Sequence, residues 1–304
     1  MKLNRLPVFL VCSFFLLSLA IVPTGCGGDK KDEEAEVETI DSNKTNLISV
    51  NGQLFSIPSP IQTSVLLKQS GAAYNKDLLN ATQSLSSYST GFQKAVNLGV
   101  YGADLSYVII YGQTQDALGY LNASKKLSDD IGVSGAFDEG LMKRFEKNMG
   151  VNDSLLSIFS SAYRATDAYL KNNDRGQESG LIIAGGWIET MYFTTNILKN
   201  NFKNKKDVIA RVAEQKTTLD HVIRLLTLNY QNPDHPQQTE LVDQLIDLYG
   251  EFEEIKVTYT FVKPTTDVAN KTTTINSTTS VDISDAQLKA ITEKVAAIRS
   301  SLIK

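Results

Sequence analysis

The sequence predicts an all-α protein, an irregular array of about eight helices arranged as helical hairpins. From about residue 47 onward, apolar side chains recur mostly with the 3.6-residue period of a helix that buries one face. Helix-capping residues, glycines and prolines separate these periodic segments. No fixed-period repeat indicates a solenoid. We therefore expect a single helical domain over residues 47–304.

The ends of the first and last predicted helices are marked by capping signals. Ser59 followed by Pro60 opens the first helix, because serine accepts from free N–H groups and proline suits the first turn. Gly71 ends that helix. Ser284 with Gln287 three residues later indicates a capping box at the start of the final helix.

The helices between them are predicted from their apolar faces. The segment 86–131 is long, and we expect it to break around Gly112. The stretch 180–198 leaves almost no polar face, and such a helix belongs at the centre of a bundle. The remaining expected helices are 137–149, one that Asn152 and Asp153 cap, and 206–230.

Two structures fit the segment before the final helix. Apolar residues in steps of four and three predict a helix over 241–262 that Pro264 stops. The alternation of β-branched and aromatic residues in 257–262 also fits a strand, which would form a small β-hairpin with 272–281, within residues 257–283. We expect the helix, because its spacing begins well before the ambiguous part.

The first residues have the layout of a secretory signal. Lys2 and Arg5 give a positive start, and 6–22 is nearly unbroken apolar sequence. This apolar core is too short to favour a permanent membrane span. It ends in Pro-Thr-Gly-Cys, at Cys26.

This ending resembles the lipobox of bacterial lipoproteins, in which small residues precede a cysteine that receives the lipid. Thr24 and Gly25 fit that pattern, whereas Pro23 stands where an aliphatic residue is usual. The resemblance implies a lipoprotein signal peptide over 1–25 and lipidation at Cys26. Several acyl chains suffice for stable membrane attachment.

Residues 26–46 are predicted to be an acidic, flexible tether. They contain too few apolar side chains to offset the entropy of ordering. The run from Cys26 to Glu34 resembles lipoproteins of Bacteroidetes-type bacteria, where such residues can direct the protein to the outer face of the outer membrane. The whole chain is also similar to uncharacterised helical lipoproteins of those bacteria. The resemblance implies the outer membrane, on its periplasmic or cell-surface face, and brings no site residues.

Composition excludes several chemistries. Cys12 would leave with the signal peptide and Cys26 would carry the lipid, so no thiol remains for disulfides, metal sites or catalysis. The formal charge of −4 becomes −6 without the two positive residues of the signal peptide, and no basic cluster suggests nucleic acid. His221 and His235 are too few for a zinc site. With no phosphate-binding loop either, we expect no metal and no cofactor.

Within the apolar stretch 180–198, paired glycines and one acid are conspicuous. Gly185 and Gly186, just before Trp187, each cost about 1 kcal/mol relative to alanine in a helix. Either a neighbouring helix or a ligand must approach closely, and we favour the helix. Glu189 needs a charged partner or a raised pKa. Arg164 is the candidate partner, unless Asp167, one helical turn away, pairs with it instead.

A tyrosine-rich run supplies a second group of candidate binding residues. Aromatic faces beside carboxylates hold sugars and cationic groups, and they also fill helix interfaces, which we favour. Tyr107 and Tyr111 share one helix face. The run comprises Tyr101, Asp104, Tyr107, Tyr111, Gln113, Asp116 and Tyr120.

These features favour a membrane-anchored envelope lipoprotein whose domain is a non-enzymatic binding or assembly module, contacting an envelope protein or a glycan. The alternative is a glycan hydrolase or lyase that uses Glu189, Asp104 or Asp116 as acid and base. An open cleft with the carboxyl groups of Glu189 and Asp104 within about 10 Å would favour the enzyme. Both groups locked in ion pairs would count against it.

Overall fold

The computed structural model describes residues 46–50, 53–57, 59–267 and 272–304. All of them fall within one compact unit that spans Val37–Lys304. The predicted signal peptide, the lipidation site Cys26 and the tether lie outside the described residues, except Asn46, which begins the first strand.

The described part is mostly helical, which confirms the predicted all-α class. Its α-helices are α1 Pro60–Gln69, α2 Gly91–Ile110, α3 Thr114–Asp130, α4 Glu139–Lys147, α5 Asn152–Asn172, α6 Gly176–Ile197, α7 Lys205–Ala213, α8 Gln215–Leu226, α9 Pro236–Glu253 and α10 Asp285–Leu302. Short 3₁₀ helices are η1 Lys76–Leu78, η2 Thr82–Ser87, η3 Ser134–Phe137 and η4 Thr227–Asn229. Three antiparallel strand pairs join β1 Asn46–Val50 with β2 Gln53–Ile57, β3 Lys256–Thr260 with β6 Thr278–Asp282, and β4 Thr265–Asp267 with β5 Thr272–Thr274.

Several predicted boundaries are confirmed. Ser59 and Ser284 both form capping boxes, each with the glutamine three residues later. Gly71 and Gly112 have φ of +89° and +74°, a backbone conformation that favours glycine. Gly112 therefore separates α2 from α3, as the sequence predicted.

Three expectations are corrected. Asn152 is the first residue of α5, and no side chain caps that helix, so the predicted cap is wrong. The segment expected as one helix over 206–230 is divided at Glu214 into α7 and α8, and η4 follows. The β1–β2 hairpin precedes the first helix where no strand was predicted.

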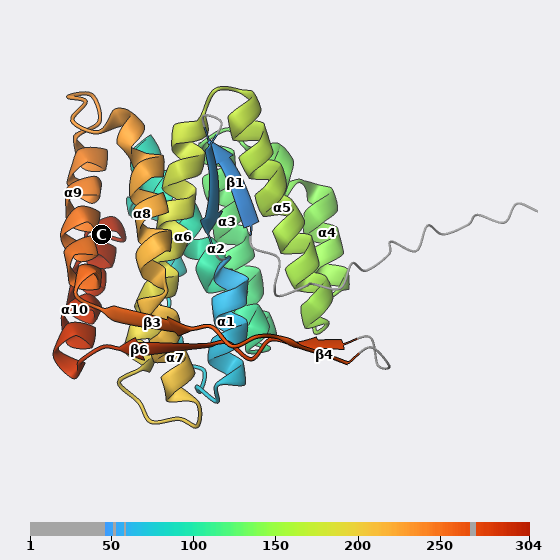
Figure 1. Ribbon diagram of the computed structural model, residues 1–304. Helices are drawn as coiled ribbons and strands as arrows, with labels where there is room; N and C mark the ends of the chain where they lie inside the picture. Colours follow the sequence, from blue (N-terminus) through green and yellow to red (C-terminus); the bar gives the residue numbers. More distant parts are fainter. Residues whose placement is uncertain (1–45, 51–52, 58, 268–271) are drawn as a thin grey trace, which may run out of the picture. The chain divides into compact units, whose positions relative to one another are not determined.

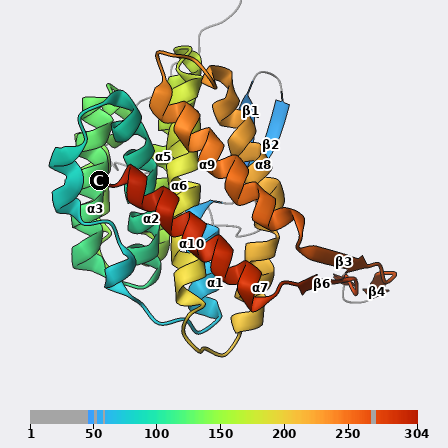
Figure 2. The same ribbon diagram turned by 90° about the vertical axis from the view of Figure 1, so that its left-hand side faces the viewer.

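The predicted helix over 241–262 is also wrong in its last part, because α9 ends at Glu253. The alternative hairpin is the correct one: Val257 pairs with Val281, and Tyr259 pairs with Thr279. Strand pairing satisfies the backbone over this β-branched segment, which local spacing alone cannot reveal. Strands β3 and β6 project from the helices (Figures 1 and 2), and the exposed side chains of β3 include Val257 and Tyr259.

Helices α2 and α6 form the centre of the core. Every residue of α2 from Ala95 to Ile110 is buried, and α6 is buried along most of its length, as its apolar sequence predicted. Gly99 of α2 lies near Gly186 of α6, and Tyr107, further along α2, lies against Phe193, further along α6. The two helices therefore run parallel. Helix α10 crosses this pair (Figure 2).

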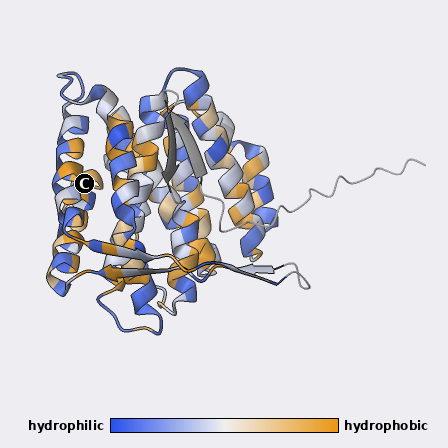
Figure 3. Ribbon diagram, in the orientation of Figure 1, coloured by the Kyte–Doolittle hydropathy of each residue, from blue (hydrophilic) through white to orange (hydrophobic). Residues whose placement is uncertain are grey.

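The outer helices complete the core with one face each. Hydrophilic and hydrophobic residues alternate along α5 and α9 (Figure 3), as they do in an amphipathic helix with one polar and one apolar face. Among the described residues, no helix combines the length and the apolar character needed to cross a membrane.

Candidate functional site

The paired glycines of α6 lie where its backbone meets that of α2. A Cβ atom on Gly185 would stand 1.9 Å from the carbonyl oxygen of Val96, and one on Gly99 would stand 1.9 Å from that of Ile182. A neighbouring helix, and not a ligand, therefore occupies the space that these glycines leave. This contact brings the acids of α2 and α6 close together.

Glu189 is fully buried and forms an ion pair with Arg299 of α10. The guanidinium donates from Nε to Oε2 at 2.6 Å and from Nη2 to Oε1 at 2.7 Å. Arg299 also donates to the carbonyl oxygen of Leu78 at 2.9 Å, and its guanidinium lies over the ring of Tyr192, 4.1 Å from the centroid. A bidentate ion pair of this kind fixes the geometry of both side chains.

Asp104 is the third member of this buried charged cluster. Its Oδ2 accepts from the Asn80 amide at 3.3 Å, whereas its buried Oδ1 has no donor among the described residues. Burial raises the pKa of Asp104 well above its usual range, and the nearby Glu189 carboxylate raises it further. Burial also raises the pKa of Glu189, and Arg299 opposes that effect. The raised pKa favours a protonated, neutral Asp104 beside the Glu189–Arg299 ion pair, and the cluster then carries no net charge.

This arrangement predicts a pH dependence that Asp104→Asn should remove. Because the pKa of Asp104 is raised in the folded state, unfolding releases its proton above about pH 4, and stability falls as the pH rises, by up to about 1.4 kcal/mol per pH unit. Asparagine is neutral at every pH and has no such proton to release. In urea unfolding between about pH 5 and about pH 8, the variant should gain stability relative to the wild type as the pH rises.

The control for this prediction is Asp129→Asn, which removes a surface carboxylate that pairs with Lys125. Its stability should follow the wild-type curve across the same pH range. Parallel curves for Asp104→Asn and the wild type would contradict a protonated Asp104.

The predicted tyrosine cluster lies inside the protein. Tyr101 and Tyr107 are fully buried, and the Tyr107 and Tyr111 ring centroids are 4.7 Å apart. Burial raises the pKa of all three, and their hydroxyls bond to the backbone: Tyr101 donates to Ala81, Tyr111 donates to Ala72, and Tyr107 accepts from Asn75. Through these hydrogen bonds, the three tyrosines hold the segment 72–81 against α2. They offer no surface on which a sugar could stack.

The other predicted residues are also interior. Trp187 is buried, and its indole donates to Gln215 of α8 at 3.0 Å. Arg164, the expected partner of Glu189, instead donates to Ser161 on its own helix. The structure thus brings Asp104 and Glu189 together, as the enzyme hypothesis required, but in a closed interior and not in a cleft.

Arg299 was missed in the sequence, although a signal for it existed. The apolar face of the last helix runs through Ile291, Val295, Ile298 and Leu302. Arg299 follows Val295 by four residues, so it lies on that same face. An arginine on a buried face must find an acid.

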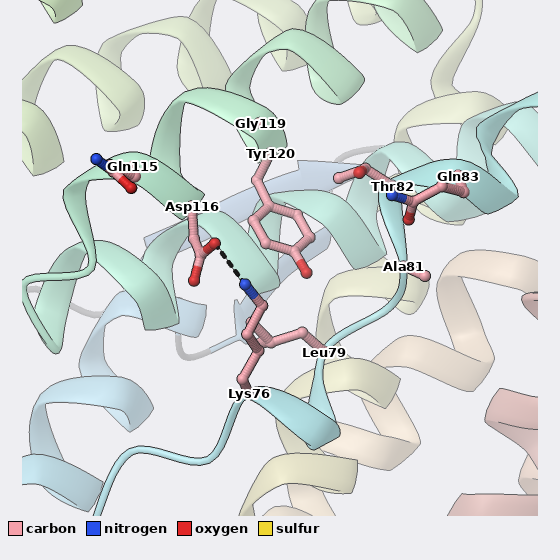
Figure 4. A pocket seen from close by; sticks show the side chains of 9 residues that line it. All are labelled: Lys76, Leu79, Ala81, Thr82, Gln83, Gln115, Asp116, Gly119 and Tyr120. Carbon is pink, nitrogen blue, oxygen red and sulfur yellow. Dashed lines mark hydrogen bonds and ion pairs between the residues drawn. The ribbon is translucent and has the colours of Figure 1, made fainter.

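A pocket opens at the surface between the segment 76–83 and α3. It has a volume of about 330 Å³. The ring of Tyr120 lies between an ion pair, Lys76 Nζ to Asp116 Oδ1 at 2.7 Å, and the residues Thr82 and Gln83 (Figure 4). Its remaining lining residues are Leu79, Ala81, Gln115 and Gly119. Two residues of the predicted tyrosine-rich run, Asp116 and Tyr120, thus face a space that a ligand can enter.

Chemistry in this pocket is limited by its single carboxylate. Glycoside hydrolysis by paired acids needs a second carboxyl group across the scissile bond. Among the described residues, Asp116 is the one acid that lines the pocket, and it also accepts from the Tyr74 hydroxyl at 3.2 Å. Across the described residues, no three His, Cys, Asp or Glu side chains gather as they would around a metal ion.

Comparisons of the chain with family models, with curated proteins and with solved structures found no match.

Proposed function

We propose that this chain is a membrane-anchored envelope lipoprotein, attached to the outer membrane through a lipid on Cys26, whose helical domain is a non-enzymatic binding or assembly module for a glycan or a protein. The sequence of the first 34 residues supports the anchor. The buried charged cluster supports the absence of catalysis, because it uses Asp104 and Glu189 to hold helices together.

The observation that carries the binding role is the contrast between this interior and the pocket. The acids suited to catalysis are inaccessible, whereas the pocket presents amides, a hydroxyl and one aromatic ring. Groups of this kind orient a ligand without transforming it. The alternative, a hydrolase or lyase with paired carboxylates, gains no support from the position of any of its proposed acids.

The anchor is tested by Cys26→Ala in the full chain expressed in a bacterium. We expect the wild type to sediment with membranes and to incorporate a labelled fatty acid. The variant should lose the label and keep the mass of its signal peptide, because the thiol that carries the lipid is gone. Cys12→Ala is the matched control, since it removes the other cysteine, and it should behave as the wild type.

Two outcomes would contradict the proposal. A Cys26→Ala protein of unchanged mature mass in the membrane fraction would remove the anchor. Release of reducing sugar from envelope glycans by the wild type, lost on Asp116→Asn, would replace the binding role with a hydrolytic one.

A further inference from the structure

Gly119 is a glycine that packing does not require. It lies in the middle of α3 and is exposed, and a Cβ atom placed on it would meet nothing within 4 Å. Gly99 and Gly185 differ, because the backbone of another helix fills their space. Glycine in a helix lowers stability relative to alanine. At Gly119 the missing side chain leaves the pocket open beside Tyr120 (Figure 4).

The floor of the pocket is partly apolar, and most of its Tyr120 side chain is buried beneath it. The Tyr120 hydroxyl donates to the carbonyl oxygen of Asn80 at 3.1 Å, and the Tyr101 ring lies behind it with centroids 6.1 Å apart. These contacts fix the position of the Tyr120 ring. Leu79 and Ala81 extend the apolar floor.

The rim of the pocket offers neutral hydrogen-bonding groups. Within the described chain, the side-chain amides of Gln83 and Gln115 have no hydrogen-bond partner, so their donors and acceptors are free for a ligand. Thr82 adds a hydroxyl. An amide both donates and accepts, which suits a ligand that carries several hydroxyl groups.

The charge of the pocket argues against an ionic ligand. In the part of the chain that the structure describes, the charged residues of the lining are Lys76 and Asp116, which form an ion pair at 2.7 Å. A phosphate would have to displace Asp116 from Lys76, and a cation would have to displace Lys76. The pocket therefore suits a neutral, polar ligand with one apolar face.

We propose that this pocket binds a neutral saccharide. The hydroxyls of a sugar match the amides of the rim, and its C–H groups can contact Leu79, Ala81 and the small exposed part of Tyr120, which is 6% exposed. A volume of about 330 Å³ is at the small end of ligand pockets, which limits the bound part to one or two sugar rings. This inference rests on the proposed binding role and names its ligand class.

The decisive variant is Gly119→Phe. A Cβ atom on Gly119 meets no other atom within 4 Å, and because Gly119 lines the pocket, a phenyl group there should narrow or block it. Gly250→Phe is the matched control, because Gly250 is also an exposed helical glycine with nothing within 4 Å, and it lies in α9. Thermal unfolding should show that both variants are folded.

Binding is measured by NMR titration and calorimetry with soluble neutral monosaccharides and disaccharides of glucose, galactose, mannose and N-acetylglucosamine. A second arm uses sedimentation with purified peptidoglycan, which separates a free sugar from a polymer-bound one. We expect saturable binding in at least one arm for the wild type and Gly250→Phe, and none for Gly119→Phe. Gln83→Ala and Gln115→Ala should each weaken binding by about two- to tenfold, the effect of one lost hydrogen bond.

The proposal is overturned if no probe binds in either arm, or if Gly119→Phe binds as tightly as the wild type. Either result leaves the proposed lipoprotein role intact, because the Cys26→Ala experiment tests the anchor independently. Loss of the anchor with saccharide binding retained would overturn the membrane attachment alone.

Discussion

Arg299→Met should lower the free energy of unfolding by about 3–5 kcal/mol, because it leaves the Glu189 carboxylate buried without its cation. Methionine replaces most of the volume of arginine, so the loss reports on the charge and its hydrogen bonds more than on a cavity. Urea unfolding followed by circular dichroism measures it.

The dependence of this loss on pH distinguishes an ion pair from packing. Without Arg299, burial raises the pKa of Glu189 further, so the folded variant must keep a proton there. A raised folded-state pKa means that stability falls as the pH rises, so the loss should be larger at about pH 8 than at about pH 5. Adding Glu189→Gln to the variant should recover part of it.

Arg224→Met is the matched control for this prediction. Arg224 pairs with Asp220 at the surface of α8, one helical turn away, and its side chain is 59% exposed. Removing a pair of this kind has little effect. If Arg299→Met lowers the free energy of unfolding as little as Arg224→Met does, at every pH, the buried charged cluster does not stabilise the fold.

Gly185→Ala is expected to have the other large effect, about 3 kcal/mol or more of lost stability. The added methyl group would stand 1.9 Å from the carbonyl oxygen of Val96, so α2 and α6 would have to separate along their shared face. Differential scanning calorimetry measures the change in melting temperature and shows whether unfolding remains cooperative.

The adjacent glycine provides a control. A Cβ atom on Gly186 would be 3.4 Å from the nearest atom, the carbonyl oxygen of Gly99, which is ordinary contact. Gly186→Ala should therefore be tolerated, since alanine is the better helix former. Equal effects of the two substitutions would show that helix propensity, and not the close approach of backbones, explains these glycines.

Local signals predicted much of this fold from the sequence. Capping boxes at Ser59 and Ser284 and the turn at Gly112 involve residues a few positions apart, so they are visible in sequence. The strand over Lys256–Thr260 depends on pairing with Thr278–Asp282. Its apolar spacing fitted a helix equally well, and only the distant partner decides between the two.

The candidate site shows the same limit. The need of Glu189 for a partner was predictable from its apolar neighbours, but the partner itself was not, because Arg299 is 110 residues away. The tyrosine-rich run was correctly recognised as aromatic packing for Tyr101 and Tyr107. The sequence could not show that Asp116 and Tyr120 of this run line a pocket, because that depends on how the segment 76–83 packs beside α3.

The position of Arg299 in α10 has a consequence for the order in which the protein matures. A polypeptide leaves the ribosome N-terminus first, so Glu189 is synthesised well before Arg299, the cation with which it pairs. Without α10, packing of α2 against α6 would bury the Glu189 carboxylate without its cation, which favours the protonated form of Glu189. A chain that ends before α10 should therefore be less stable than the full chain, and limited proteolysis would measure the difference.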